Sequence, residues 1–546
     1  MKVREAIGDA LAVLGVDTVF ALAGAANLAL LNDLAARLGI RIVHGRHEAA
    51  VVSMADGLAR FTGRPAVATV TAGPGLTNTA TALAVARSHR SPVLLLAGDV
   101  PAQAVRHPQR LDQAALARSL GCRTATARHA GDLLPALRSA HAALAGGEPF
   151  VLNLPLDTQE TDVPRPDPHA WTAPLPPAAT PLDGQLNVAA EHLVRARRVG
   201  ILAGRGAADA HTGLLLRHLA DSVPAVLATT LGANGLFTGH PCDAGMTGAL
   251  GDGRAGSELA ACDVLLAVGT SLHPLTLPSP GGTTTVIRVD TAEPDRDLAA
   301  DTDVFVRGDA TAVVRRLLAL LRGRAPETHG IPTPPHRPPG RRATDPRPYQ
   351  DTLTTVDPRH ALAELLPLLP PTAGIVIGGG HASVTACQMV PAPGIRSWTC
   401  PSTDFGAIGQ SLAVALGACF SAPSRRIVHI TGDGDLMMAL GELHTAVRYH
   451  LPLTVIVLND QGFGQERHQL GESIQRGLAD HPSPDLAALA KHALNAASYR
   501  IDGPSDLHHL KQAMQHPHGL VLVDIRTTPG YRNPASTNIA QALATM

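Results

Sequence analysis

The chain alternates short runs of branched apolar residues with longer stretches in which apolar residues recur at helical spacing. In the first third, the runs RIVHGR, AVATVTAG and PVLLLAGD each end in a loop that leads into an alanine-rich helical stretch. This alternation predicts a parallel sheet covered by helices. The N-terminal segment MKVREAIGDALAVLGVDTVF is typical of an amphipathic helix followed by a strand, not of a signal peptide.

The same rhythm returns twice, and proline-rich stretches separate the repeats. Strand-like runs in the middle are VGILAG, DVLLAVG and TTVIRVD, and later ones are GIVIGG, RRIVHITGDG, LTVIVLND and LVLVDIR. Residues 164–186 and 326–350 have the composition of linkers. We therefore predict an α/β fold of three doubly wound parallel-sheet domains, at residues 1–165, 187–325 and 351–546.

Composition narrows the class of protein. The 546 residues are 45% hydrophobic and carry a net charge of −1, which favours a globular enzyme over a nucleic-acid or membrane-surface protein. No apolar run is long enough to predict a membrane span. The six cysteines form no CxxC pair and are typical of buried residues in a reducing compartment, so we expect a cytoplasmic protein.

The stretch 431–462 carries the most specific chemical signal. A strand ends in Gly432-Asp433-Gly434, a helical segment follows, and the next strand ends at Asp460. Because ligands of parallel α/β sheets lie beyond the carboxyl ends of strands, both aspartates are predicted at one edge. The glycines let the backbone approach a phosphate, and two hard oxygen ligands beside it indicate Mg²⁺. A lone GDG would be only a turn; the second acidic strand end makes the pattern specific.

This stretch resembles the thiamine diphosphate motif of the acetolactate synthase and 2-oxo acid decarboxylase superfamily, and the resemblance spans nearly the whole chain. It implies a pyrimidine-binding, a central and a diphosphate-binding domain. It also implies that Asp433, Asp460 and the backbone carbonyl of Gly462 hold Mg²⁺. Gly432, Gly434 and Asp435 would then contact the cofactor. The family architecture implies a homodimer or homotetramer, with each cofactor enclosed by two subunits.

The N-terminal block carries a candidate catalytic glutamate. Glu48 lies in RHEAA, before ADGLAR and TGRP, and this pattern is similar to the pyrimidine-binding domain of the family. There the matching glutamate contacts the aminopyrimidine ring and activates the cofactor; a helix-capping glutamate is the plain alternative. TAGPGLTN resembles an active-site loop of the family and makes Gly73, Gly75 and Asn78 cofactor-binding candidates. By itself this loop would be a Pro-Gly turn.

Five further residues are candidates for proton transfer or cofactor contacts. Gln113 lies where many carboligases have an active-site glutamine, and an exposed helix residue is an equal alternative. Glu466 matches a proton-relay glutamate of pyruvate decarboxylase-like enzymes, and a helix-surface residue is again the alternative. GGGHAS looks like a diphosphate-contacting loop in which Gly380 and Ser383 would bind the cofactor. His381 in the same loop is a candidate for cofactor contact and, like Gln113 and Glu466, for catalysis by proton transfer or substrate orientation; solvated loop residues are the alternative.

In DFGAIGQSLAVALGA the glycines suit tight helix–strand packing. By the resemblance, Ile408 is the apolar wedge that bends the cofactor, and the Gly406 carbonyl accepts from its amino group. The middle block resembles the central domain of acetolactate synthases, but residues 269–275 read GTSLHPL and lack the arginines and acidic residues found in FAD-containing members. This departure puts FAD and the usual acceptor-binding arginine in doubt.

The resemblance implies Mg²⁺- and thiamine diphosphate-dependent decarboxylation of a 2-oxo acid, carboligation of the resulting enamine to a carbonyl acceptor, or both. Glu466 favours decarboxylation, whereas the middle block favours carboligation. One alternative is a flavin- or nicotinamide-dependent oxidoreductase or nucleotide-binding protein on a similar scaffold, although Gly204-Arg205-Gly206 lacks the third glycine of a dinucleotide motif. A noncatalytic member of the family is a further alternative, which the intact acidic residues argue against.

Overall fold

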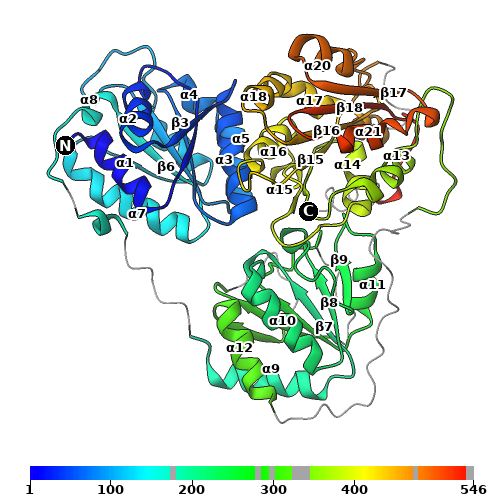
Figure 1. The fold of residues 1–546 in the computed structure, drawn as a ribbon. Coiled ribbons are helices and arrows are strands. Elements are labelled where there is room, and N and C mark those ends of the chain that lie inside the picture. Colours follow the sequence, from blue (N-terminus) through cyan, green and yellow to red (C-terminus); the bar gives the residue numbers. More distant parts are fainter. Residues whose placement is uncertain are drawn as a thin grey trace.

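The strands of the protein form three separate parallel sheets. The computed structural model describes residues 1–165, 167–172, 180–276, 284–293, 302–322, 345–470 and 477–536. Within these ranges the strands form three six-stranded sheets, and all pairings between named strands are parallel. Helices flank each sheet (Figure 1). This confirms the predicted α/β fold with three parallel-sheet domains.

The first unit is built from the N-terminal residues. Its strands are β1 Thr18–Ala21, β2 Arg41–His44, β3 Ala66–Val70, β4 Val93–Asp99, β5 Arg123–Thr126 and β6 Phe150–Pro155. Its helices are α1 Val3–Val13, α2 Leu28–Leu38, α3 Glu48–Thr62, α4 Pro74–Thr77, α5 Ala80–His89, α6 Gln113–Ser119, α7 Leu133–Ala145 and α8 Leu156–Gln159. Strands β3 and β6 are buried along their whole length, which is why they read as continuous apolar runs and not as alternating ones.

The middle unit has a different strand order. Its strands are β7 Val199–Ala203, β8 Ala225–Thr229, β9 Asp243–Met246, β10 Val264–Val268, β11 Thr285–Asp290 and β12 Val304–Arg307. Its helices are α9 Asp183–Arg195, α10 Ala210–Ser222, α11 Arg254–Ala260 and α12 Ala310–Leu321. The order across the sheet is β12-β11-β10-β7-β8-β9. Aspartates begin two of the helices, because the side chains of Asp209 and Asp309 accept from backbone N–H groups of α10 and α12.

The third unit repeats the topology of the first. Its strands are β13 Gly374–Ile377, β14 Trp398–Thr399, β15 Ile427–Gly432, β16 Leu453–Asn459, β17 Ala497–Ile501 and β18 Val521–Arg526. Its helices are α13 Pro358–Leu365, α14 His381–Met389, α15 Ser402–Phe405, α16 Ser411–Ala418, α17 Asp433–Met438, α18 Leu443–Arg448, α19 Gly464–Leu470, α20 Leu486–Leu494 and α21 His509–Gln515. The orders β2-β1-β3-β4-β6-β5 and β14-β13-β15-β16-β18-β17 correspond strand for strand. The shared rhythm seen in the sequence therefore reflects a shared fold.

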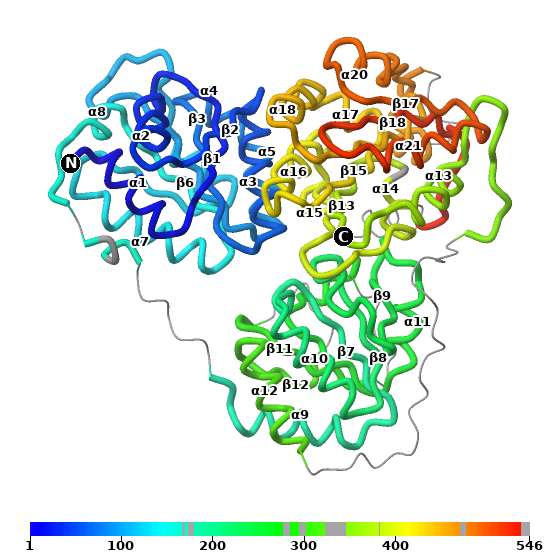
Figure 2. Tube along the Cα trace, in the orientation of Figure 1, coloured from blue at the N-terminus to red at the C-terminus, as the bar shows by residue number. Residues whose placement is uncertain are grey.

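Helices α3 and α16 join the first and third units (Figures 1 and 2). A Cβ atom on Gly57 would lie 2.1 Å from the carbonyl oxygen of Val414, and one on Gly417 would lie 1.9 Å from that of Met54. Only glycine allows the two backbones to approach this closely. One buried apolar cluster therefore runs through both units, and it includes residues of both helices.

The helix expected at LMMALGELHTAVRYH is broken. It divides into α17, a 3-10 turn at Leu440–Glu442 and α18. Apolar periodicity continues across the break, so the sequence pattern alone predicted one helix. The turn lets the buried side chain of Glu442 contact the first unit.

Two further features concern the predicted linkers and membrane character. Residues 326–344 of the second predicted linker lie outside the described residues, whereas 345–350 pack on the third unit through Asp345 and Arg359. Of the first linker, Trp171 is buried against the first unit.

No helix in the described ranges is long and apolar enough to cross a membrane.

Candidate active site

The two predicted metal-binding aspartates meet at the carboxyl edge of the third sheet. Strands β15 and β16 are parallel neighbours, with Gly432 opposite Leu458. Asp433 begins α17 directly after β15, and Asp460 follows β16 directly. Both side chains line one cavity of about 730 Å³.

The electrostatics of this pair fit a divalent cation. Asp433 accepts a hydrogen bond from Ser483 at 2.6 Å through Oδ2, while its buried Oδ1 has no hydrogen-bond partner among the described residues. Burial raises the pKa of Asp433. Burial and the neighbouring charge of Asp433 raise the pKa of Asp460 to about 7, against the opposing effect of Arg467. Two crowded carboxylates with an unpartnered oxygen are stabilised by a bound cation.

The third predicted ligand is a backbone carbonyl. Gln461 has φ of +60°, and this turn separates Asp460 from Gly462. A Cβ atom on Gly434 would lie 3.8 Å from the Gly462 carbonyl oxygen, so this oxygen faces the GDG loop. No cluster of three or more His, Cys, Asp or Glu side chains in the described ranges could hold a metal ion. A metal here therefore depends on the two carboxylates and on backbone oxygen.

The cavity lies between the third sheet and loops of the middle unit. Residues Thr247, His273 and Leu275 of the middle unit form part of its wall. No local pattern in the sequence predicted these residues, because they reach the site from another domain. Predicted site residues that line the cavity are Gly380, His381, Ser383, Gly406, Ile408, Gly432, Asp433, Gly434, Asp435, Asp460, Gly462 and Glu466.

Asp435 organises the loops around the cavity. Its carboxylate accepts hydrogen bonds from the Gly379 amide at 3.0 Å and the Thr431 hydroxyl at 2.6 Å. The Gly409 amide and the Ser411 hydroxyl also donate to it. Its oxygens are thus engaged by the protein, and Asp435 holds together the loops that line the cavity.

The glycine loop after β13 packs against the predicted wedge. A Cβ atom on Gly379 would lie 2.4 Å from Cγ2 of Ile408, so the loop must be free of side chains there. Gly406 ends α15 with φ of +72°, a conformation that glycine adopts without strain. Ser383 donates to the Gly378 carbonyl at 2.5 Å and closes the loop, so its proton is not free for a ligand.

His381 is buried and neutral. Its Nε2 lies 2.6 Å from the Tyr531 carbonyl, which can only accept, so Nε2 carries the proton. Its Nδ1 has no partner among the described residues. Burial, followed by the neighbouring His468, lowers the pKa of His381 to about 4. His381 can therefore accept a hydrogen bond through Nδ1; it is not a cationic phosphate donor.

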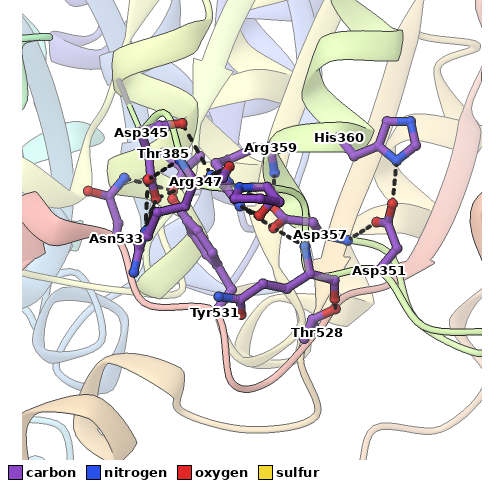
Figure 3. Close-up of polar contacts among 12 residues, drawn as sticks. Asp345, Arg347, Asp351, Asp357, Arg359, His360, Thr385, Thr528, Tyr531 and Asn533 are labelled. Atoms are coloured by element: carbon purple, nitrogen blue, oxygen red, sulfur yellow. Dashed lines mark hydrogen bonds and ion pairs between the residues drawn. The ribbon is translucent and has the colours of Figure 1, made fainter. Parts of the chain in front are cut away.

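The segment that carries Tyr531 is fixed by a polar cluster (Figure 3). Asn533 donates to Thr385 of α14 at 2.9 Å. The guanidinium of Arg359 lies 4.8 Å from the centre of the Tyr531 ring and pairs with Asp357 at 2.6 Å. This cluster ties the chain after β18 to α13 and α14, and so holds the acceptor of His381 in place.

The predicted residues of the first unit lie apart from this cavity. Glu48 is the first residue of α3, and Asn78 donates to its Oε2 at 3.0 Å. Gln113 is buried, where it accepts from the Gly73 amide at 2.9 Å and donates to Asn153 at 3.1 Å. Gln113 is thus neither exposed nor at the cavity, and it supports the loop of Gly73 and Gly75. Glu466, by contrast, is exposed on α19 at the cavity wall.

Comparisons with known proteins agree with this architecture. Three domain models of thiamine pyrophosphate enzymes match the chain, where thiamine pyrophosphate is another name for thiamine diphosphate. They are the N-terminal TPP binding domain at residues 1–116, the central domain at 186–317 and the C-terminal TPP binding domain at 378–525.

The curated relatives match over most of their length. The chain is 30% identical to a protein of Pseudomonas aeruginosa named "Probable 2-ketoarginine decarboxylase", covering 96% of this chain and 93% of the relative. It is 28% identical to the acetolactate synthase isozyme 3 large subunit of Escherichia coli, covering 94% and 92%. It is 30% identical to 2-hydroxyacyl-CoA lyase 2 of Bos taurus, covering 87% and 82%. The fold and cavity define a ligand-binding α/β protein, and the chain belongs to the thiamine pyrophosphate enzyme family.

Proposed function

We propose that the protein is a thiamine diphosphate- and Mg²⁺-dependent enzyme that decarboxylates a 2-oxo acid, joins the resulting fragment to a carbonyl acceptor, or does both. The observation that carries the proposal is the facing pair Asp433 and Asp460 at the strand ends of a thiamine pyrophosphate enzyme domain. One carboxylate oxygen of the pair has no hydrogen-bond partner within the part of the chain that the structure describes. The relatives, named as synthase, decarboxylase and lyase, support this reaction class. They do not favour the oxidoreductase alternative.

Each part of the site receives a role. Asp433, Asp460 and the Gly462 carbonyl would hold Mg²⁺, which would supply positive charge to neutralise the diphosphate. When bound, thiamine diphosphate supplies a nucleophilic carbon and an electron sink for the electrons released with CO₂. Glu48 would hydrogen-bond the aminopyrimidine ring and activate the cofactor, and Ile408 would pack against the cofactor. Glu466, at the exposed side of the cavity, donates or accepts a proton.

Two copies of the chain complete each site. Glu48 and the Asp433 cavity lie in different parts of one chain, which supports a cavity closed by the first unit of a second copy. Phe405 and Met438, beside the cavity-lining segments, are 57% and 62% exposed, as an uncovered subunit interface would be. A homodimer is the minimum assembly, and a homotetramer is consistent with it. Six unpaired cysteines support a reducing compartment such as the cytoplasm.

Calorimetric titration of the apo-protein with thiamine diphosphate, with and without Mg²⁺, tests the cofactor assignment. We expect metal-dependent binding that Asp433→Asn abolishes. Product analysis with 2-oxo acids, alone and with an aldehyde acceptor, then separates decarboxylation from carboligation. Glu48→Gln should bind the cofactor but lose turnover, and normal turnover in that variant would refute the assigned mechanism.

A further inference from the structure

Glu442 is a buried carboxylate that the assigned site does not use. It ends the 3-10 turn after α17, belongs to the third unit and is 2% exposed. Its Oε2 accepts from the Thr445 hydroxyl at 2.6 Å. Its Oε1 accepts from two backbone amides of the first unit, those of Arg46 at 2.8 Å and His47 at 3.1 Å. The carboxylate of Glu442 therefore accepts hydrogen bonds from both the first and the third unit, at the boundary between them.

These amides directly precede the candidate catalytic residue. His47 is the extended N-cap residue of α3, with φ of −143° and ψ of 148°, and its ring accepts from the Ala49 amide. Glu48 is the next residue. Amides at and before an N-cap have no partner within the helix, so an external acceptor can fix them. Two hydrogen bonds to one carboxylate oxygen set the direction from which the chain enters α3.

A second hydrogen bond at the same seam provides a contrast. The hydroxyl of Tyr449 accepts from the His44 amide at 2.8 Å, at the end of β2. This contact also joins the two units, but it is neutral and lies further from Glu48. Hydrogen bonds to ionised acceptors are stronger than neutral ones. If Glu442 served only to hold the domains together, loss of either contact would have the same consequence.

We propose that Glu442 is a positioning residue that sets the orientation of the Glu48 carboxylate toward the aminopyrimidine ring of the cofactor. The hydrogen bonds that the Arg46 and His47 amides donate to Glu442 fix the first turn of α3. Asn78 restrains the Glu48 carboxylate from the other side. This inference rests on the proposed function, because it takes Glu48 as the group that activates the cofactor. Glu442, which lies at the break of the expected helix, would then contribute to that activation.

The test compares full-length variants loaded with thiamine diphosphate and Mg²⁺. The readouts are the rate of hydrogen–deuterium exchange at C2 of the bound thiazolium, cofactor affinity by calorimetry and the thermal unfolding midpoint. Glu442→Ala should slow exchange by on the order of 10- to 100-fold, as small displacements of catalytic groups do, with cofactor affinity unchanged. Glu442→Asp, too short to reach both amides, should also slow exchange. Glu442→Gln keeps an oxygen acceptor of the same reach for both amides, although a neutral and weaker one, and should recover most of the wild-type exchange rate.

Tyr449→Phe is the matched control and should lower the unfolding midpoint without slowing exchange. The inference is overturned if Glu442→Asp and Glu442→Ala exchange at the wild-type rate, or if Tyr449→Phe slows exchange as much as they do. If the Glu442→Ala variant does not fold, the exchange rate of the Glu442→Asp variant decides the test. Wild-type exchange in Glu48→Gln would overturn the proposed function; slow exchange there with normal exchange in the Glu442 variants would overturn only this inference.

Discussion

The facing carboxylates Asp433 and Asp460 make the stability of the protein, and the metal binding that we propose for them, depend on pH. The ordinary pKa of Asp460 is 3.8, and in the folded protein it is raised to about 7. The folded apo-protein therefore binds more protons than the unfolded chain between these values. The contribution of Asp460 to stability is fully present below the unfolded pKa and is lost as the pH rises through about 7.

We predict that Mg²⁺, added with the cofactor, raises the unfolding temperature more at pH 8 than at pH 6. At pH 8 the apo-protein carries two repelling carboxylates that the metal neutralises, whereas at pH 6 a proton must first leave. Scanning calorimetry at both values measures the effect, with Asp460→Asn as the control that removes the titrating group. An equal shift at both pH values in the wild type would contradict the prediction.

Gly379 is predicted to be required for the position of Ile408. In Gly379→Ala the new Cβ atom would meet Cγ2 of Ile408 at 2.4 Å and displace it into the cavity. Overpacking of this kind costs roughly 1–3 kcal/mol, so we expect cofactor affinity to fall by about tenfold or more. Gly394→Ala, where a Cβ atom would meet nothing within 4 Å, is the control for calorimetric titration. Equal affinities of the two variants would show that Ile408 does not support the cofactor.

Single residues also show how far the sequence predicts the site. The spacing of Asp433 and Asp460 predicted their meeting, because it depends only on parallel strands ending at one edge. The partners of Asp435 and Gln113 could not be predicted in this way, because they come from loops distant in the sequence. The neutral state of His381 likewise depends on burial and on the carbonyl of Tyr531, far along the chain.

At the scale of elements, the crossing of α3 and α16 determines how the first and third units join. Gly57→Ala would place a methyl group 2.1 Å from the Val414 carbonyl oxygen, so the helices must separate. We predict a loss of roughly 1–3 kcal/mol in stability, seen as a lower unfolding midpoint. Gly184→Ala in α9, where the methyl group would meet no described residue within 4 Å, should instead stabilise by up to about 1 kcal/mol. Similar midpoints for both variants would show that the crossing tolerates extra volume.

The sequence predicted elements well where burial alone decides them. The continuous apolar runs became strands β7, β10 and β11, as expected from sheets covered on both faces. The sequence-based prediction was wrong at Leu440–Glu442, where apolar residues continue at helical spacing but the backbone forms a 3-10 turn. The turn is stabilised by contacts with another domain, and no local propensity encodes a partner almost 400 residues away, as the Arg46 amide is.

At the scale of the whole molecule, Glu48 and the Asp433 cavity lie apart in one chain, so the proposed mechanism requires a second copy. In one chain these residues belong to units joined by α3 and α16, and Glu48 is held there by Asn78. If the first unit of a second copy covers the Asp433 cavity while α3 and α16 stay packed within each chain, each site takes its glutamate from one chain and its metal ligands from the other. A symmetric dimer then contains two such sites.

Mixing two inactive variants tests this arrangement. Glu48→Gln and Asp433→Asn should each be inactive alone, but a mixed dimer has one site with both lesions and one site with neither. Random reassociation of equal amounts gives about half mixed dimers, so we expect about a quarter of the wild-type turnover. The control mixes Asp433→Asn with Asp460→Asn, whose lesions fall in the same half of the site and leave every site defective. Recovery only in the first mixture would establish that two chains build each site, whereas no recovery in either would mean that each chain closes its own.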